Sequence, residues 1–436
     1  MTNLLRVGYY LGIGYRRLHW NPSKMRRYQE KKLRSIVRHA YNYVPFYHRL
    51  LRAAGVLPDD IRFLEDLSKL PVVKKNELRH SNFADLLSVG AKGSLKTMRT
   101  SGSTGEPFKF CINAQENDWR KALYMRGNIV CGQKPRDRWV VVTAPHHFFD
   151  TTSIQKRIGV FSQDCVSLFF PIEKQVELVS KLSPDVLDGY SGSLLLLAQE
   201  AMRQNIKSIN PRIIFGTADL IDQNSRRLVE EVFNAPFYDQ FGCAEIDRAA
   251  WQCPEKKGYH IDVDSVIVQF VDSEGKDVAV GEKGEVVYTS LFSKTQPFIR
   301  YGINDVGEAL SDECSCGIKL PMMKVVEGRK DSFIRLPNGG MLSPMGFWTI
   351  MHYFENADQI EQFRVIQNSL ESIKILVKKT KGLKVDDDVL RRNLVNHLAT
   401  CLRVDNEQPI ELEVEFVEEL TRDKSGKLRS VISSLN

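Results

Sequence analysis

The segment SLLLLAQEAMRQNIKSINPRIIFG, residues 193–216, joins a helical pattern to a short apolar strand. Residues 193–204 are rich in leucine, alanine and glutamine, which favour a helix. The part PRIIFG contains β-branched and aromatic residues that favour a strand, and a similar run, RWVVVTA, lies at 138–144. Helices that alternate with short apolar strands are typical of α/β layers, so we expect an α/β fold.

Length and composition indicate a soluble globular protein with more than one domain. The chain has 436 residues, of which 42% are hydrophobic and 26% charged, close to globular averages. Its net charge of +7 is spread over many residues, so no nucleic-acid partner is expected. The eight cysteines, without a signal-peptide pattern at the start, predict a reducing compartment and a cytoplasmic location.

The N-terminal stretch MTNLLRVGYYLGIGYRRLHW is aromatic and basic. Arg6 interrupts it, and its apolar length falls short of a membrane span. We expect a helix docked on the protein, with a peripheral membrane contact as the alternative. From Tyr28 to about Leu78 apolar residues recur at helical spacing, which predicts a helical region.

The strand pattern changes in the second half of the chain. Between residues 262 and 310, strands such as DVDSVIVQFVD and GEVVYTSL alternate with charged, glycine-containing turns, which predicts a compact β subdomain. Further on, strand and helix patterns alternate to the end. We therefore predict a large N-terminal domain over residues 1–328, built of layered β-sheets and helices, and a small mobile α+β domain over residues 329–436.

The segment TSGSTGEP, Thr100 to Pro107, is a loop of glycines and hydroxyl residues. Glycines let the backbone approach a phosphate, free N–H groups form an anion nest, and hydroxyls add donors. The segment lacks the G-x-x-x-x-G-K-[ST] pattern, which disfavours a P-loop NTPase. A flexible Ser/Gly linker is the alternative interpretation.

Two carboxylates follow strand-like segments. In YDQFGCAEI, residues 238–246, Glu245 supplies a hard oxygen suited to Mg²⁺, although a single glutamate after a strand is more often a solvated charge. In PFIRYGINDVG, residues 297–307, Asp305 can accept hydrogen bonds from ribose hydroxyls or can cap a turn.

The C-terminal segment TRDKSGKLRSVIS, residues 421–433, places Lys427 beside Gly426 among other cations. A lysine on a flexible segment can neutralise charge that develops on a phosphoryl group. A basic, solvated tail is the alternative.

The order of these motifs resembles that of the adenylate-forming (acyl-CoA synthetase-like) enzymes, and in particular the phenylacetate-CoA ligase branch with its relatives encoded with capsular polysaccharide genes. The segments RHAYNYVPFYHRLLRAAGV, DLSKLPVVKKNELR and DGYSGSLLLLAQEA add to the resemblance, which extends from about residue 28 to 432.

The resemblance implies a role for each motif in binding ATP/AMP, Mg²⁺ and CoA. Glu245 would bind Mg²⁺, Asp305 the ribose, and Lys427 the α-phosphate and carboxylate. Arg329 and Asp331 would lie at the hinge of the small domain. The catalytic residues would be Lys427, Glu245 and Arg329. The loop residues Ser101, Gly102, Ser103, Thr104 and Gly105 would hold the β- and γ-phosphates of ATP, with Thr100 as a further nucleotide-binding residue. The residues around the adenine would be Thr217, Ala218, Asp239, Gln240, Phe241 and Gly242. Glu106 departs from the family, in which many members carry lysine, and Lys109 could compensate for the difference.

Three cysteines and a histidine form a candidate metal set. Cys253 and His260 are separated by six residues, and Cys314 and Cys316 form a C-x-C pair. Three thiolates and one imidazole would fill a tetrahedral Zn²⁺ site and leave no position for water, which indicates a structural role. The spacing alone equally fits four unrelated residues, but relatives in this branch carry a similar set.

The acyl pocket is predicted from the family's arrangement. Its candidate residues are His146, His147, Phe148, Phe149, Tyr190 and Ser191. The aromatic side chains could stack on an aryl acid or could close a small pocket. Adjacent histidines are also common at the surface.

We expect an acid-thiol ligase that forms an acyl-CoA, and the resemblance also allows a homodimer. An amide-forming ligase in surface polysaccharide assembly is the alternative, with an amine as acceptor. A third hypothesis is a zinc-stabilised, non-catalytic nucleic-acid-binding or scaffold protein.

Overall fold

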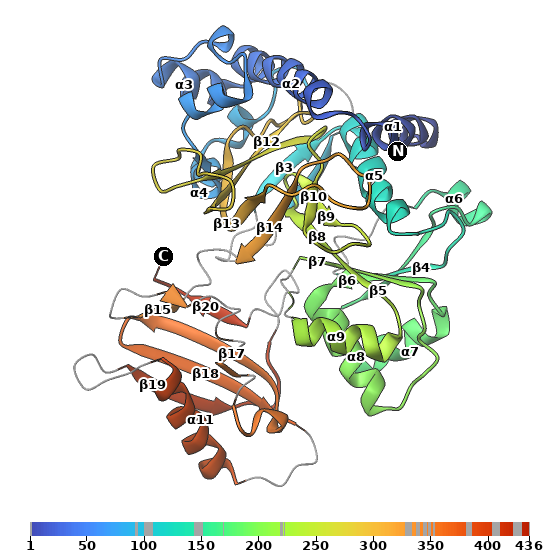
Figure 1. The fold of residues 1–436 in the computed structure, drawn as a ribbon, viewed down its shortest axis with the longest axis vertical. Helices are drawn as coiled ribbons and strands as arrows, with labels where there is room; N and C mark the ends of the chain where they lie inside the picture. The colour runs from blue at the N-terminus through green and yellow to red at the C-terminus, as the bar shows by residue number, and fades with distance from the viewer. Residues whose placement is uncertain are drawn as a thin grey trace. The chain divides into compact units, whose positions relative to one another are not determined.

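The structure is a computed structural model of the chain (Figure 1). It describes residues 2–91, 95–99, 108–143, 151–168, 170–218, 221, 223–327, 334–336, 341–342, 347, 350–351, 354–380, 386–402, 410–421 and 430–435. Contacts within the chain divide it into two compact units, Met1–Val326 and Glu327–Asn436. The predicted domain boundary lay two residues further along the chain.

The N-terminal unit combines helices with one large sheet. Its helices are α1 (Leu4–Arg17), α2 (Pro22–Tyr43), α3 (Pro45–Ala53), α4 (Lys75–His80), α5 (Ala114–Val130), α6 (Ser153–Ile158), α7 (Ile172–Leu182), α8 (Ser191–Arg203) and α9 (Gln223–Phe233), with 3₁₀ turns at Pro58–Asp60, Leu64–Lys69 and Phe83–Leu86. Its strands are β1 (Val73–Lys74), β2 (Lys96–Arg99), β3 (Lys109–Ile112), β4 (Trp139–Thr143), β5 (Gln163–Ser167), β6 (Val186–Tyr190), β7 (Ile213–Thr217), β8 (Phe237–Cys243), β9 (Asp247–Gln252), β10 (Tyr259–Ile261), β11 (Val266–Val271), β12 (Lys283–Ser290), β13 (Tyr301–Leu310) and β14 (Met322–Glu327).

Helix α1 is docked on α5, as the sequence predicted. Asn3 caps its first turn by accepting a hydrogen bond from the backbone N–H of Arg6 at 3.1 Å. Val7 and Tyr10 are buried in a small apolar cluster with Trp119 of α5. The aromatic residues of the N-terminal stretch therefore contribute in part to packing inside the protein.

A buried ionic network ties α1 and α5 to the chain beyond β10. The guanidinium of Arg126 donates to Asp262 at 2.5 Å, to Asp264 at 2.9 Å and to the carbonyl of Gly14 at 3.0 Å. Arg17 of α1 also reaches Asp264, at 3.5 Å. Two carboxylates compensate the fully buried arginine, so removal of one partner would leave an unpaired buried charge.

Strands β4 to β8 form the parallel half of the sheet, in the order β5-β4-β6-β7-β8. Helices α7, α8 and α9 lie against it (Figure 1). The strands are buried almost throughout, which explains their continuous apolar runs. Parallel pairing aligns the carboxyl ends of β6, β7 and β8 at one edge.

The predicted β subdomain is part of the same sheet. Strand β9 pairs antiparallel with β8, and the order continues β9-β10-β14-β13-β12-β11, so a single twelve-stranded sheet carries both halves. Strand β1 lies outside this linear order and pairs in parallel with β13. The predicted β-rich segment is therefore the antiparallel half of this sheet, which continues from the parallel half through the direct pairing of β8 with β9.

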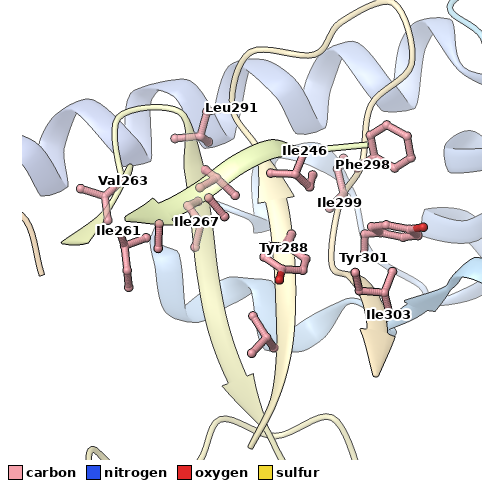
Figure 2. Close-up of a cluster of buried hydrophobic side chains, with 14 of the residues drawn as sticks. Ile246, Ile261, Val263, Ile267, Tyr288, Leu291, Phe298, Ile299, Tyr301 and Ile303 are labelled. Carbon is pink, nitrogen blue, oxygen red and sulfur yellow. The ribbon is translucent and has the colours of Figure 1, made fainter. Parts of the chain in front are cut away.

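Large side chains from several strands fill the core of the antiparallel half. Figure 2 shows Tyr288, Phe298, Ile299, Tyr301 and Ile303 among them. The phenol oxygens of the two tyrosines have polar partners despite their burial.

The C-terminal unit has its own hydrophobic core and is of the α+β type. Its elements are strands β15 (Ile334–Arg335), β16 (Met341–Leu342), β17 (Ile360–Ser369), β18 (Ser372–Lys379), β19 (Glu411–Phe416) and β20 (Val431–Ser433), helix α11 (Asp387–Cys401) and a 3₁₀ turn at Ala357–Gln359. Four of the strands form a sheet in the order β19-β18-β17-β20. Leu390, Leu394 and Leu398 of α11 are buried in this core.

Among the helices that the structure describes, none is long and apolar enough to span a membrane.

Candidate functional site

The carboxyl ends of β6 and β7 bring four candidate residues together. Tyr190 pairs with Thr217 in the register of these strands, and Ser191 donates its hydroxyl hydrogen to the Thr217 carbonyl at 3.4 Å. Ala218 follows with a φ of +72°, so the chain turns sharply there. The predicted acyl residues Tyr190 and Ser191 therefore adjoin the predicted adenine residues Thr217 and Ala218.

The next strand, β8, adds Asp239, Phe241 and Gly242. Asp239 lies beside Gly216 of β7, and its carboxylate accepts a hydrogen bond from the Tyr259 hydroxyl at 2.7 Å. Gly242 is required sterically, because a Cβ there would overlap the Asp247 carbonyl. Phe241 is half-buried.

The side chain of Gln240 points into the protein interior. Its side-chain nitrogen donates to Asn128 at 2.8 Å, and Asn128 donates in turn to Gln133 at 2.9 Å. Since all three side chains are buried, Gln240 can offer a nucleotide its backbone but not its amide nitrogen.

Glu245 is a buried carboxylate held by two donors. Oε1 of Glu245 accepts a hydrogen bond from the Tyr301 hydroxyl at 2.6 Å and lies 3.1 Å from Nζ of Lys75. Burial alone would raise the pKa of Glu245, but the charge of Lys75 and the hydroxyl of Tyr301 lower it below its usual value. The group is therefore a carboxylate at neutral pH, as a metal ligand must be.

Asp305 lies in the same neighbourhood. Its carboxylate accepts a hydrogen bond from Tyr288 of β12 at 3.3 Å. Burial and then the charges of Glu245 and Asp305 raise the pKa of the Cys243 thiol well above its usual value. Both carboxylates thus act on one thiol, although 60 residues separate them in the sequence.

A further buried carboxyl lies on β6, two residues before Tyr190. Asp188 accepts hydrogen bonds from the Tyr124 hydroxyl at 2.9 Å and from the Trp139 indole at 3.2 Å. Burial raises its pKa to about 7, even though both hydrogen bonds act in the opposite direction.

Several predicted site residues lie outside the residues that the structure describes. These are Thr100, Ser101, Gly102, Ser103, Thr104, Gly105, Glu106, His146, His147, Phe148, Phe149, Arg329, Asp331 and Lys427. Lys109 is described and lies exposed at the start of β3.

The four candidate zinc ligands come together. One potential ligand atom from each of Cys253, His260, Cys314 and Cys316 lies within 4.8 Å of the others. Sγ of Cys253 is 3.6 Å from Sγ of Cys314, and Sγ of Cys316 is 3.3 Å from Nε2 of His260. The donors come from β10 and from the segments after β9 and β13.

The orientation of His260 fits a metal. Its Nδ1 lies 3.2 Å from the Leu320 carbonyl and can donate to it, which leaves the lone pair of Nε2 on the side of the sulfur atoms. Burial lowers the pKa of His260, so the ring is neutral. Three thiols and a neutral imidazole, with their potential ligand atoms within 4.8 Å of one another, fit a closed tetrahedral Zn²⁺ site.

The sequence did not assign roles to Lys75, Tyr301 and Tyr288. Lys75 lies in the quoted segment DLSKLPVVKKNELR, but nothing in that segment distinguishes it from Lys74. Tyr301 lies within the Asp305 motif, in which only Asp305 was given a role. Their function as donors to carboxylates depends on strand register, which a single sequence does not give.

Comparison with known proteins finds ligases. A family model described as the CapK C-terminal domain matches residues 336–434. Phenylacetate-coenzyme A ligase of Pseudomonas putida is 26% identical over 393 residues, 87% of each chain. The Escherichia coli K12 protein of the same name is 28% identical over 319 residues, 70% of this chain and 71% of its own length.

A solved structure shares the fold. It is a 2-hydroxyisobutyryl-CoA ligase in the postadenylation state in complex with 2-HIB-AMP, with a TM-score of 0.77 and 20% identity. The match covers 96% of this chain and 92% of the other.

Proposed function

We propose that this chain, which belongs to the adenylate-forming superfamily and to its phenylacetate-CoA ligase and capsular polysaccharide ligase branch, is an AMP-forming acid-CoA ligase. A carboxylate oxygen of the acid attacks the α-phosphorus of ATP, and the bond to the bridging oxygen breaks to release pyrophosphate. The thiolate of CoA then attacks the acyl carbon and AMP leaves. The observation that carries the proposal is the buried carboxylate of Glu245, held by Lys75 and Tyr301.

Each motif takes one part of the ATP in this proposal. Thr217, Ala218, Asp239, Phe241 and Gly242 surround the adenine, a role supported by the aligned ends of β7 and β8. The other roles are those that the family resemblance implies. Asp305 binds the ribose, and the loop Thr100 to Gly105 binds the phosphates. The acyl pocket is lined by Tyr190, Ser191 and His146 to Phe148.

Glu245 fits the proposed magnesium site. Its carboxylate is charged, buried and already paired with a cation, the Lys75 ammonium. When bound, Mg²⁺ would neutralise phosphate charge that otherwise repels the attacking carboxylate. Tyr301 would keep the Glu245 side chain in one orientation.

The C-terminal unit carries Lys427, which we propose contacts the α-phosphate and the acid during adenylation. Arg329 and Asp331 would form the hinge about which this unit swings between the two half-reactions. These roles of Lys427, Arg329 and Asp331 are the ones that the family resemblance implies.

We also propose a structural zinc held by Cys253, His260, Cys314 and Cys316. It would join the segments after β9 and β13 to β10, two strands away from the Gly242 motif of β8. The metal would stabilise the antiparallel half of the sheet and take no part in the reaction.

An amine acceptor is the second candidate, and it follows from the resemblance to relatives encoded with capsular polysaccharide genes. The activated acid would then form an amide in surface polysaccharide assembly. Adenylation is common to both candidates, and only the nucleophile of the second step differs.

The N-terminal segment supports a peripheral contact with an anionic membrane. On α1, Leu5 is 88% and Tyr9 66% exposed. Residues 1–38 carry ten lysines and arginines and one glutamate, a net charge of +9. Exposed apolar side chains next to a basic region match an interfacial helix.

The homodimer stays a prediction, and the eight cysteines, all without a disulfide, support a cytoplasmic location.

Exchange of labelled pyrophosphate into ATP, measured with a panel of carboxylic acids and Mg²⁺, tests adenylation. One or more acids should support exchange, and CoA or an amine should then consume the adenylate. If aryl, hydroxy and sugar acids all fail with folded, zinc-loaded protein, the proposed function is wrong.

A further inference from the structure

Lys75 contacts the proposed magnesium ligand Glu245. We propose that this contact prevents Glu245 from binding a divalent cation unless the cation arrives with a nucleotide. In the nucleotide-free protein, Lys75 holds the carboxylate and disfavours binding of a divalent cation. This inference rests on the proposed magnesium role of Glu245. Lys75 would be a positioning residue.

The contact is close and shielded from water. Nζ of Lys75 lies 3.1 Å from Oε1 of Glu245, and the side chains of Lys75 and Glu245 are 17% and 2% exposed. Tyr301 donates to the same oxygen at 2.6 Å. A metal ion would therefore have to compete with the Lys75 ammonium for Oε1, whereas the neutral Tyr301 hydroxyl orients this oxygen.

Strand register fixes Lys75 in this place. Strand β1 pairs in parallel with β13, with Val73 opposite Tyr301 and Lys74 opposite Gly302. The backbone N–H of Val73 donates to the Arg300 carbonyl at 2.8 Å. Helix α4 begins at Lys75, directly after this pairing. The pairing of β1 with β13 therefore keeps Lys75 and Tyr301, the two donors to Oε1 of Glu245, close to each other.

The neighbouring lysine has a different partner. Nζ of Lys74 contacts both carboxylate oxygens of Glu285, each at 2.5 Å. The two adjacent lysines are thus assigned to two different glutamates, and only Lys75 reaches Glu245. Lys74 offers a matched control with the same charge, one residue away.

Charge decides when a metal can bind. A divalent cation at the usual distance of about 2.1 Å from Oε1 would stand close to the Lys75 ammonium and be repelled by it. The polyphosphate of ATP brings negative charge that can accept both the metal and the displaced ammonium. Metal binding should therefore be weak without nucleotide and strong with it.

Mn²⁺ binding, followed by electron paramagnetic resonance, tests this without turnover. Wild type, Lys75→Met, Lys75→Gln, Lys75→Arg and Lys74→Met are titrated with Mn²⁺ alone and with α,β-methylene-ATP. Removing the Lys75 charge should tighten Mn²⁺ binding without nucleotide by about tenfold or more. Lys75→Arg and Lys74→Met should behave like wild type.

Adding Glu245→Gln to Lys75→Met should abolish the gained site. Unchanged Mn²⁺ affinity in both folded variants, Lys75→Met and Lys75→Gln, would overturn the inference, as would an equal gain in Lys74→Met. Failure of the proposed function shows itself differently, because wild type would then support no pyrophosphate exchange with any acid, whatever its Mn²⁺ affinity.

Discussion

Tyr301 of β13 donates a 2.6 Å hydrogen bond to the carboxylate of Glu245, which lies in the turn between β8 and β9. The ring of Tyr301 is fully buried in the hydrophobic core, and only its hydroxyl reaches the carboxylate. Core packing therefore determines where the proposed metal ligand points.

Tyr301→Phe should weaken Mg²⁺ binding while keeping the ring in the core. Loss of one hydrogen bond to a charged group should cost about 1.5 to 3 kcal/mol. We expect a raised Mg²⁺ requirement in pyrophosphate exchange, measured at saturating ATP. Tyr288→Phe is the matched control, because it removes a donor to Asp305 and should raise the KM for ATP instead. Identical kinetic effects of both variants would contradict this division.

Lys427→Ala should separate the two half-reactions. Adenylation should collapse, because the lysine is proposed to offset charge at the α-phosphate, whereas thioester formation from preformed acyl-adenylate should largely survive. Lys424→Ala, in the same segment, should leave both steps intact. Equal loss of both steps in Lys427→Ala would remove the proposed role.

The purified protein should contain about one equivalent of zinc, measured by inductively coupled plasma mass spectrometry. Cys253→Ser should lose most of the metal and melt at a lower temperature, because an open ligand set no longer ties β10 to its neighbouring segments. Cys111→Ser changes a buried thiol outside the cluster and should keep the zinc. Full zinc content in Cys253→Ser would disprove the ligand set.

Asp188 should make the protein less stable as the pH rises from about 4 to about 7. Its pKa is about 7 in the folded protein against 3.8 for an ordinary carboxyl, so the folded state retains a proton that the unfolded chain releases. The resulting loss of stability begins near pH 4 and is complete above about 7, at about 1.4 kcal/mol per pKa unit.

Urea unfolding at pH 5 and pH 8 measures this effect. Between the two pH values, wild type should lose about 2 to 3 kcal/mol more than Asp188→Asn, in which the titrating group is absent. Asp185→Asn is the control, because its hydrogen bond with Arg138 lowers the pKa of Asp185. A difference between wild type and Asp188→Asn that does not change with pH would contradict the assignment.

Vesicle sedimentation tests the proposed membrane contact. The protein should sediment with vesicles rich in phosphatidylglycerol at low salt and remain free with pure phosphatidylcholine vesicles. The Leu5→Ser, Tyr9→Ser double variant should bind less, whereas Val280→Ser, at an exposed position elsewhere, should bind like wild type. Equal sedimentation of all three proteins would argue against α1 as the contact.

Local patterns predicted much of the fold. The runs at 138–144, 193–204 and 211–216 correspond to β4, α8 and β7, because their apolar periodicity is a property of neighbouring residues. The continuity of the sheet from β8 to β9 was missed, since pairing of strand edges leaves no signature in one sequence.

The candidate site was predictable to a similar degree. Glu245 and Asp305 could be proposed from motif order, and the zinc set from residue type. The Lys75–Glu245 pair could not, because it depends on the parallel register of β1 with β13, across more than 200 residues of chain. Contacts set by long-range register require the structure.

The network around Arg126 also affects how the protein is made. The Gly14 carbonyl accepts a hydrogen bond from Arg126 and Arg17 contacts Asp264, so α1 cannot complete its polar contacts until most of the N-terminal unit has been synthesised. At usual rates of translation that delay is on the order of tens of seconds. During it the apolar face of α1 can already pack on α5, so the apolar contacts of the first helix can form before its ionic contact with Asp264.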